Sequence, residues 1–268
     1  LPGAAAVEMG HNFSLVHDDI EDNGTERRHR PALWTVWGKA QAINTGDALF
    51  TLSRMALYRL EEEGFDDSRI LRLMRLYDQT CLDLCEGQFL DIWTSEHDQW
   101  MSVDYYFDMI GRKTAALIAG SAEAGAVLAT DDEAAISAYR QFGWALGLAF
   151  QLNDDLLGIW GDEGQTGKET SDIATRKKTL PLIYALAEST GADQSRLQAI
   201  LAQSDTEPTP DENAEVLAIL ERVGAQEYTR TQAREHRDEA LAQLGSVGTV
   251  DRASMERLAD VVRGVIRA

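Results

Sequence analysis

Two pairs of adjacent aspartates, far apart in the chain, are the residues whose types and spacing could do chemistry. The first pair, Asp18 and Asp19, is followed by Asp22 and by the arginines Arg27 and Arg28. Residues four apart share one face of a helix, so Asp18 and Asp22 point the same way if this stretch is helical. Carboxylates without His or Cys suit a hard ion such as Mg²⁺, and guanidinium groups bind phosphate oxygens. The stretch therefore predicts a site that holds a diphosphate through metal.

The second pair, Asp154 and Asp155, follows the apolar run at residues 142–149. Gln151 precedes the two aspartates by three and four residues, so all three side chains can share a helical face. A polar stretch with clustered cations comes next, as it does after the first pair. Either acidic cluster alone would be explained most simply as a solvated helix end, because charge runs usually are solvated. The repetition of one arrangement favours a shared function.

The elements that must position these residues are helices. Apolar residues recur at steps of three, four and seven over residues 38–63 and 70–92. Ser102 begins a helix that continues past Gly125, and Asp131 begins the helix that ends in the second pair. Helices are also expected at residues 1–22, 180–187, 212–223, 225–244 and 251–266, with a polar lid at 161–178. Strand-like alternation is nowhere sustained, so the sequence predicts an all-α bundle of long helices around a central cavity.

Composition narrows the classes of function. With 45 acidic and 25 basic residues the formal net charge is −20, which disfavours nucleic acid and anionic membrane surfaces as partners. An anionic substrate would then need a divalent metal to neutralise the acidic clusters. No apolar run reaches the ~20 residues of a membrane span, so stable membrane insertion is not expected. The two cysteines, Cys81 and Cys85, cannot form a disulfide framework, which fits a reducing cytoplasm and a cytoplasmic location.

Taken together, these residues resemble the trans-isoprenyl diphosphate synthase (polyprenyl synthetase) family. Its first motif, DDxxD, is matched at the first aspartate pair, and the paired arginines stand at the family spacing. The resemblance covers most of residues 1–190 in ordered succession. The further matches are a GQxxD element at Gln88 and Asp91, a lysine–threonine pair at Lys113 and Thr114, the second aspartate motif at Gln151, Asp154 and Asp155, and a lysine loop at Lys168, Asp172 and Lys177.

The resemblance implies a single-domain prenyltransferase over residues 1–268 that condenses an allylic diphosphate with isopentenyl diphosphate, head to tail. It implies Mg²⁺ as cofactor, with three ions expected beside the bound diphosphate, and a homodimer. The implied metal ligands are Asp18, Asp22, Asp91, Asp154 and Asp155. The implied catalytic residues are Asp18, Asp19, Asp22, Lys113, Asp154 and Lys168. The implied substrate-binding residues are His11, Arg27, Arg28, Gln88, Lys113, Thr114, Gln151, Lys168 and Lys177, whereas Lys178 is expected to be solvated.

Two positions depart from the family pattern. The third aspartate of the second motif is replaced by Gly158, which leaves that cluster one carboxylate poorer. The Gly-Lys-x-Arg-Pro segment with which the family binds isopentenyl diphosphate is missing upstream of the first motif. Because the chain begins at Leu1 rather than at methionine, we expect further N-terminal helices to precede it.

The resemblance also bears on product length, which in this family depends on residues about one turn before the first motif. Here these residues are Phe13 and Ser14. A phenyl group at this place, with no insertion inside Asp18–Asp22, resembles synthases that make geranylgeranyl diphosphate. Farnesyl diphosphate is the alternative product.

Three other functions fit the sequence less well. A class I terpene cyclase would need serine and glutamate where the chain has Leu157 and Gly161. A head-to-head, squalene-type synthase would need a second acidic motif that the stretch Asp154–Gly158 does not match. A non-catalytic subunit of a heteromeric synthase is suggested by Gly158, but such subunits generally lose the first motif, which is intact here.

Overall fold

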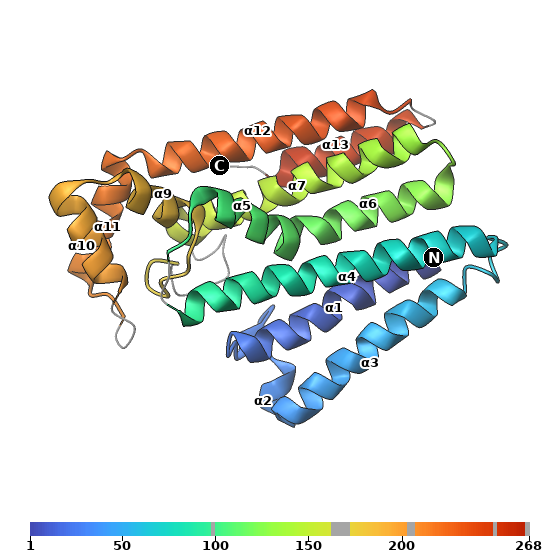
Figure 1. Ribbon diagram of the computed structural model, residues 1–268, viewed down its shortest axis with the longest axis horizontal. Helices are drawn as coiled ribbons and strands as arrows, with labels where there is room; N and C mark the ends of the chain where they lie inside the picture. The colour runs from blue at the N-terminus through green and yellow to red at the C-terminus, as the bar shows by residue number, and fades with distance from the viewer. Residues whose placement is uncertain (98–99, 162–171, 203–206, 249–250, 266–268) are drawn as a thin grey trace.

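Long helices lie side by side and form the body of the molecule (Figure 1). The computed structural model describes residues 1–97, 100–161, 172–202, 207–248 and 251–265. The helices are α1 Pro2–Glu21, α2 Leu33–Trp37, α3 Lys39–Tyr58, α4 Asp67–Glu96, α5 Val103–Ile110, α6 Ala116–Ala129, α7 Glu133–Trp160, α9 Leu180–Glu188, α10 Gly191–Leu201, α11 Pro210–Arg222, α12 Ala225–Ser246 and α13 Arg252–Val265. The π-helical turn η1, Gly111–Ala115, joins α5 to α6, and the strands β1 Glu26–Arg27 and β2 Arg30–Pro31 form a short antiparallel hairpin. The predicted all-α bundle is confirmed.

Short polar side chains fix where several helices begin. Asp66, Ser102 and Asp132 each accept a hydrogen bond from a backbone N–H two or three residues further on, at the starts of α4, α5 and α7. Thr209 and Glu212 form a reciprocal capping box at the start of α11. Each cap satisfies a backbone donor that the helix itself leaves unpaired, which contributes about 1 kcal/mol.

Apolar faces hold the described helices together in four clusters of buried side chains. Phe13 of α1, Leu73 of α4 and Ile136 of α7 are buried in one cluster. Leu152 of α7 and Ile183 of α9 are buried in another. Burying each such side chain stabilises the fold by roughly 1.5–3 kcal/mol. The packing therefore fixes α1, α4 and α7 relative to one another.

The C-terminal ends of α1, α4 and α7 lie at the same end of the bundle, beside α5 (left in Figure 1). Each of these helices carries one of the acidic motifs found in the sequence close to that end. The bundle thus brings together residues that are far apart in the chain. Among the residues described, no helix has both the length and the apolar character needed to cross a membrane.

The π-helical turn η1 interrupts the helix that the sequence predicts from Ser102 past Gly125. A Cβ atom on Gly87 of α4 would lie 2.6 Å from the Cα of Lys113, and one on Gly147 of α7 would lie 2.5 Å from the Cα of Ala115. The backbones of α4 and α7 therefore press on η1 from both sides, at distances that only glycine allows. Single π turns inside helices are frequent at functional sites, and this one carries Lys113 and Thr114.

Three further details differ from the sequence-based prediction. The helix α3 ends at Tyr58, and turns rather than helix continue to Gly64. The helix α10 was not predicted, because its mostly polar sequence has no clear apolar period. The hairpin was not predicted either, since strands of two residues are too short to show alternation.

Candidate active site

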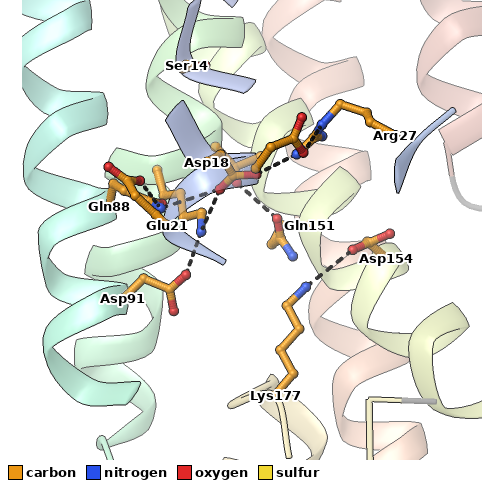
Figure 2. A network of polar contacts seen from close by, with 12 residues as sticks. Ser14, Asp18, Glu21, Arg27, Gln88, Asp91, Gln151, Asp154 and Lys177 are labelled. Carbon is orange, nitrogen blue, oxygen red and sulfur yellow. Dashed lines mark hydrogen bonds and ion pairs between the residues drawn. The ribbon is translucent and has the colours of Figure 1, made fainter. Parts of the chain in front are cut away.

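A cavity of about 2570 Å³ opens where α1, α4 and α7 end. Asp18 of α1, Asp91 of α4 and Asp154 of α7 all line it, as does Lys177 from the segment before α9. Figure 2 shows these side chains directed at a shared space. The two aspartate motifs therefore meet at one cavity, as an active site built from both of them requires.

The first motif is tied to the hairpin that follows it. The Nη2 of Arg27 donates to Asp18 at 2.7 Å, and its Nε donates to Asp19 at 2.8 Å. The side chain of Asp19 is only 9% exposed, so most of the charge of this carboxylate is balanced by one guanidinium. Although burial opposes the charge of Arg27, the two carboxylates raise the pKa of its guanidinium. The predicted diphosphate-binding arginine is thus held beside the predicted metal ligands.

The turn of the hairpin has an unusual backbone. Arg28 and His29 both have positive φ, at 53° and 59°, as the central residues of a type I′ turn do. Asparagine and glycine are the usual residues there, because a side chain with a Cβ is strained in this region. The turn nevertheless places Arg28 on the cavity wall. Retaining arginine at a strained position points to a functional use for its side chain.

Lys113 connects the first motif to α4. Its Nζ lies 2.5 Å from Asp91 and 3.7 Å from Asp18. Burial opposes the charge of Lys113, but Asp91 and then Asp18 outweigh it and raise the pKa of the ammonium group. Gln88 donates to Glu21 at 2.8 Å and more weakly to Asp18 at 3.4 Å. Carboxylates and cations therefore alternate across this wall of the cavity (Figure 2).

A chain of hydrogen bonds runs from η1 into α7. The hydroxyl of Thr114 donates to the Oε1 of Gln151 at 2.9 Å, and the amide of Gln151 donates to Asp155 at 3.2 Å. Thr114 and Gln151 both line the cavity, so the structure brings together two residues that the sequence assigns to substrate binding.

Asp155 does not take the position expected of a metal ligand. It is 1% exposed, it accepts hydrogen bonds from the Tyr106 hydroxyl and from the Leu180 backbone N–H at 2.8 Å, and it is not among the residues that line the cavity. Burial raises the pKa of Asp155 to about 6. A carboxylate whose lone pairs already accept from three donors has little capacity left for metal, so its place in the structure is that of an anchor between α5, α7 and α9.

Asp154 faces the cavity from α7, opposite Asp18, and the Nζ of Lys177 lies 3.9 Å from its Oδ2. Burial opposes the charge of Lys177, but Asp172, Asp155 and Asp154 raise the pKa of its ammonium group. Lys178, which was expected to be solvated, is half-buried instead: it donates to the Thr94 carbonyl and its Nζ lies 5.7 Å from the Trp100 ring centre. Lys168 lies outside the described residues.

The cavity continues along α1, away from the aspartates. Ser14 lines it there. His11 lines the cavity closer to the hairpin, where burial, and then the charges of Arg28 and Arg27, lower the pKa of its imidazole. Phe13 borders the cavity too, but its ring is 8% exposed and packs against Phe50, with 5.1 Å between ring centres. Apolar or small side chains of α4 and α6 complete this part of the wall, namely Leu84, Leu117, Ile118 and Ser121. This part suits a hydrocarbon chain rather than a charged group.

The residues present fit a divalent metal brought in with a diphosphate. No group of three or more His, Cys, Asp or Glu side chains in the described part of the chain forms a ready-made metal cage. Mg²⁺ needs none, because it usually takes one or two carboxylates, several waters and the oxygens of a phosphate. Asp22 also lines the cavity, and its desolvation together with the charge of Asp18 raises its pKa. Carboxylates that repel one another in this way favour a bound cation.

Two residues that hold the site together, Glu21 and Tyr106, were missed in the sequence. Glu21 accepts a hydrogen bond from Gln88, and its place beside the DDxxD aspartates was a signal that could have found it. Tyr106 holds Asp155 from 49 residues away, and nothing in its sequence neighbourhood indicated this.

Known protein sequences match most of this chain. Residues 2–220 match the sequence model of the polyprenyl synthetase family. A geranylgeranyl diphosphate synthase of Mycobacterium tuberculosis is 40% identical over 91% of this chain and 68% of its own length. A (2E,6E)-farnesyl diphosphate synthase of the same species is 38% identical over 96% of this chain and 70% of its own.

Solved structures show the same bundle. A polyprenyl synthetase from Streptomyces coelicolor superimposes with a TM-score of 0.89 and 41% identity, over 99% of this chain and 78% of that one. A polyprenyl synthase from Caulobacter crescentus, solved with calcium and isoprenyl diphosphate, gives a TM-score of 0.83 and 32% identity, over 100% of this chain and 79% of that one.

Proposed function

Since the chain belongs to the polyprenyl synthetase family, we propose that it is a short-chain prenyl diphosphate synthase, a transferase that condenses an allylic diphosphate with isopentenyl diphosphate. The observation that carries the proposal is the meeting of the two aspartate motifs at one cavity, with cations between the carboxylates. The related Caulobacter crescentus enzyme, solved with a divalent metal and isoprenyl diphosphate, supports the use of such a metal here.

In this proposal the carboxylates of Asp18, Asp22 and Asp91 would hold Mg²⁺ from one wall and Asp154 would hold it from the other. When bound, the metal neutralises charge that develops on the departing diphosphate. Asp155 is left out of the ligand set because its oxygens accept from protein donors.

The cations of the chain bind the diphosphate groups directly. Arg27 and Lys113, which pair with carboxylates in the structure, exchange these partners for phosphate oxygens of the allylic substrate. Lys177 approaches from the second motif, and Lys168 is assigned by its place in the lysine loop alone. His11 and Arg28 are proposed to face isopentenyl diphosphate. Stabilising negative charge on a leaving group is usually the largest electrostatic contribution to such a reaction.

The reacting carbon atoms lie among neutral dipoles. Gln88, Thr114 and Gln151 line the cavity with oxygen atoms that stabilise an allylic cation without capturing it. In this proposal the apolar side chains of α4 and α6 border the hydrocarbon part of the substrate. The proton released after condensation passes to the diphosphate product, so no side-chain base is required.

We propose geranylgeranyl diphosphate as the product, with farnesyl diphosphate as the alternative; relatives with each activity match at similar identity. Ser14→Phe should shorten the product, because it fills the cavity wall beside the first motif. Phe13 is proposed to form the floor of the cavity, where the growing chain stops. Phe13→Ala should therefore lengthen the product, although the loss of buried volume costs about 3 kcal/mol of stability. Chromatography of dephosphorylated products distinguishes these outcomes. Products unchanged in both variants would exclude these residues as the floor.

The direct test incubates the purified full-length protein with Mg²⁺, farnesyl diphosphate and isopentenyl diphosphate. Diphosphate release that depends on isopentenyl diphosphate, together with a geranylgeranyl product, supports the synthase. Release without isopentenyl diphosphate would indicate a cyclase, and the absence of turnover would indicate a non-catalytic subunit. The homodimer and the cytoplasmic location stay predictions.

A further inference from the structure

The hydrogen bonds that link Thr114, Gln151 and Asp155 all point the same way. The hydroxyl of Thr114 donates to Oε1 of Gln151 at 2.9 Å, and Nε2 of Gln151 donates to Oδ1 of Asp155 at 3.2 Å. An ionised carboxylate accepts hydrogen bonds and has none to donate. Asp155 therefore needs the amino group of Gln151 on its side, and this requirement turns the amide oxygen of Gln151 towards Thr114.

The direction of these bonds decides which atoms the cavity receives. Gln151 and Thr114 both line the cavity, whereas Asp155 is not part of its wall. The hydroxyl proton of Thr114 is used in its bond to Gln151, so the Thr114 oxygen has only lone pairs left to offer. The amide oxygen of Gln151 likewise keeps one lone pair. Both residues thus present the negative end of a dipole, which stabilises a positive charge in the cavity.

Two further donors prevent the side chain of Asp155 from turning over. Its Oδ2 accepts from the hydroxyl of Tyr106 and from the backbone N–H of Leu180, the latter at 2.8 Å. Tyr106 and Asp155 are each 1% exposed, so water does not replace these partners. A backbone N–H can only donate. The place of Oδ2 must therefore be held by an acceptor, and the place of Oδ1 is the one that meets Gln151.

We propose that Asp155 is a positioning residue: it turns the side-chain amide of Gln151, and through it the hydroxyl of Thr114, so that their oxygens face the reacting carbon atoms. The inference rests on the proposed function, because the charge that these oxygens would stabilise is the allylic cation of that reaction. Asp155 would thus act on the reaction from outside the cavity, through a single hydrogen bond.

The variant Asp155→Asn should reverse the chain of hydrogen bonds. Tyr106 and Leu180 keep the new oxygen at the place of Oδ2, so the new amino group meets Gln151. Gln151 then turns its oxygen to that amino group and its own amino group to Thr114, and donors replace acceptors in the cavity. Turnover should fall about 100-fold. Stabilisation by Mg²⁺ with inorganic pyrophosphate, measured by thermal unfolding, should match the wild type.

A binding measurement detects the reversal without turnover. Two unreactive analogues of the allylic diphosphate are compared by calorimetry, one with an ammonium group in place of the reacting carbon and one neutral. Asp155→Asn should weaken binding of the ammonium analogue about tenfold relative to the neutral one. Measurements well above pH 6 keep the wild-type carboxylate of Asp155 ionised.

An exchange of the two side chains guards against misfolding of Asp155→Asn. The double variant Asp155→Asn/Gln151→Glu keeps the total charge, gives Tyr106, Leu180 and Thr114 their acceptors, and again turns an oxygen towards the cavity. It should bind the ammonium analogue at least as tightly as the wild type, and it should be more stable than Gln151→Glu alone, in which two carboxylates face each other.

Two controls separate orientation from stability and from charge. Tyr106→Phe also removes a hydrogen bond from Asp155 but leaves the orientation of Gln151, so it should lose far less turnover than Asp155→Asn at a similar loss of melting temperature. Asp193→Asn removes a charge from a surface ion pair with Arg222 and should match the wild type.

The inference is wrong if Asp155→Asn keeps the wild-type preference for the ammonium analogue, if the double variant does not restore that preference, or if Tyr106→Phe loses as much turnover as Asp155→Asn. Absence of turnover in the wild type, with the analogue results as expected, would refute only the proposed reaction.

Discussion

The two aspartate motifs place their paired aspartates in the same way, but the groups that those aspartates contact differ. In each motif the first aspartate, Asp18 or Asp154, faces the cavity with a cation beside it. The second aspartate is buried and holds the segment that follows. Asp19 accepts from Arg27 of the hairpin, and Asp155 accepts from the backbone of Leu180, each at 2.8 Å. Adjacent aspartates therefore have two separate tasks.

The difference lies in the charge of the donor. A guanidinium balances the carboxylate of Asp19, whereas Asp155 receives only neutral donors, namely a phenol, an amide and a backbone N–H. Burial disfavours the charged form of a carboxylate, and it raises the pKa of Asp155 to about 6 although the nearby charge of Lys177, and then the hydrogen-bond donors, oppose this shift. The first motif is thus anchored by an ion pair and the second by hydrogen bonds.

The largest expected effect concerns the aspartates that face the cavity. Asp18→Ala or Asp154→Ala should lower turnover about 1000-fold or more, because each removes a carboxylate that holds the metal at the departing diphosphate. Both variants should stay folded, as neither residue is fully buried. Steady-state kinetics at saturating Mg²⁺ measures the loss, with Asp193→Asn as control. If turnover fell less than tenfold in either variant, that residue would not be a metal ligand.

Next in size is the contrast between the two anchors. Asp155→Ala should cost about 4 kcal/mol of unfolding free energy, because it leaves two buried donors and the half-buried amide of Gln151 without an acceptor. Asp19→Ala should cost about 1 kcal/mol, since water can reach the guanidinium of Arg27, which is 35% exposed. Denaturant unfolding measures both values. Equal losses would show that the anchors do not differ.

The raised pKa of Asp155 makes a prediction about pH. The folded protein keeps this proton until about pH 6, whereas the unfolded chain releases it near 3.8. The contribution of Asp155 to the free energy of unfolding is therefore fully present below pH 3.8 and is lost as the pH rises through 6. This contribution is at most about 3 kcal/mol. The difference in unfolding free energy between the wild type and Asp155→Asn, measured in EDTA, should change by that amount across this window. A difference that stays constant would contradict the raised pKa.

The smallest expected effect comes from backbone strain in the two segments that follow the motifs, namely the hairpin after the first motif and the segment before α9 after the second. Arg28 in the hairpin and Arg176 before α9 have φ of 53° and 52°. Arg28→Gly should raise stability by about 1 kcal/mol and weaken isopentenyl diphosphate binding, as a rise in KM. Arg176→Gly should gain less, because it loses a hydrogen bond from its Nε to the Ile200 carbonyl. Thermal unfolding with KM measurements separates the two, and a destabilised Arg28→Gly would show that the turn is not strained.

Local signals in the sequence were sufficient for much of this structure. Helix starts at Ser102 and near Asp132, and both acidic pairs at helix ends, depend on residues within a turn or two of each other. The positions of Asp155 and of η1 depend instead on distant partners. Tyr106 captures Asp155 across 49 residues, and Gly87 admits η1 across 26. No periodicity carries such information, so the sequence suggested Asp155 as a ligand and an unbroken helix after Ser102.

The two glycines that pack against η1 restrict which substitutions the enzyme can accept. Gly87 and Gly147 let two backbones touch the turn that carries Lys113, so any replacement there displaces main chain rather than a side chain. The opposite end of the same cavity is walled by interchangeable side chains such as Ser14 and Ser121. Laboratory evolution should accordingly find the reaction resistant to alteration but the size of the product easy to shift.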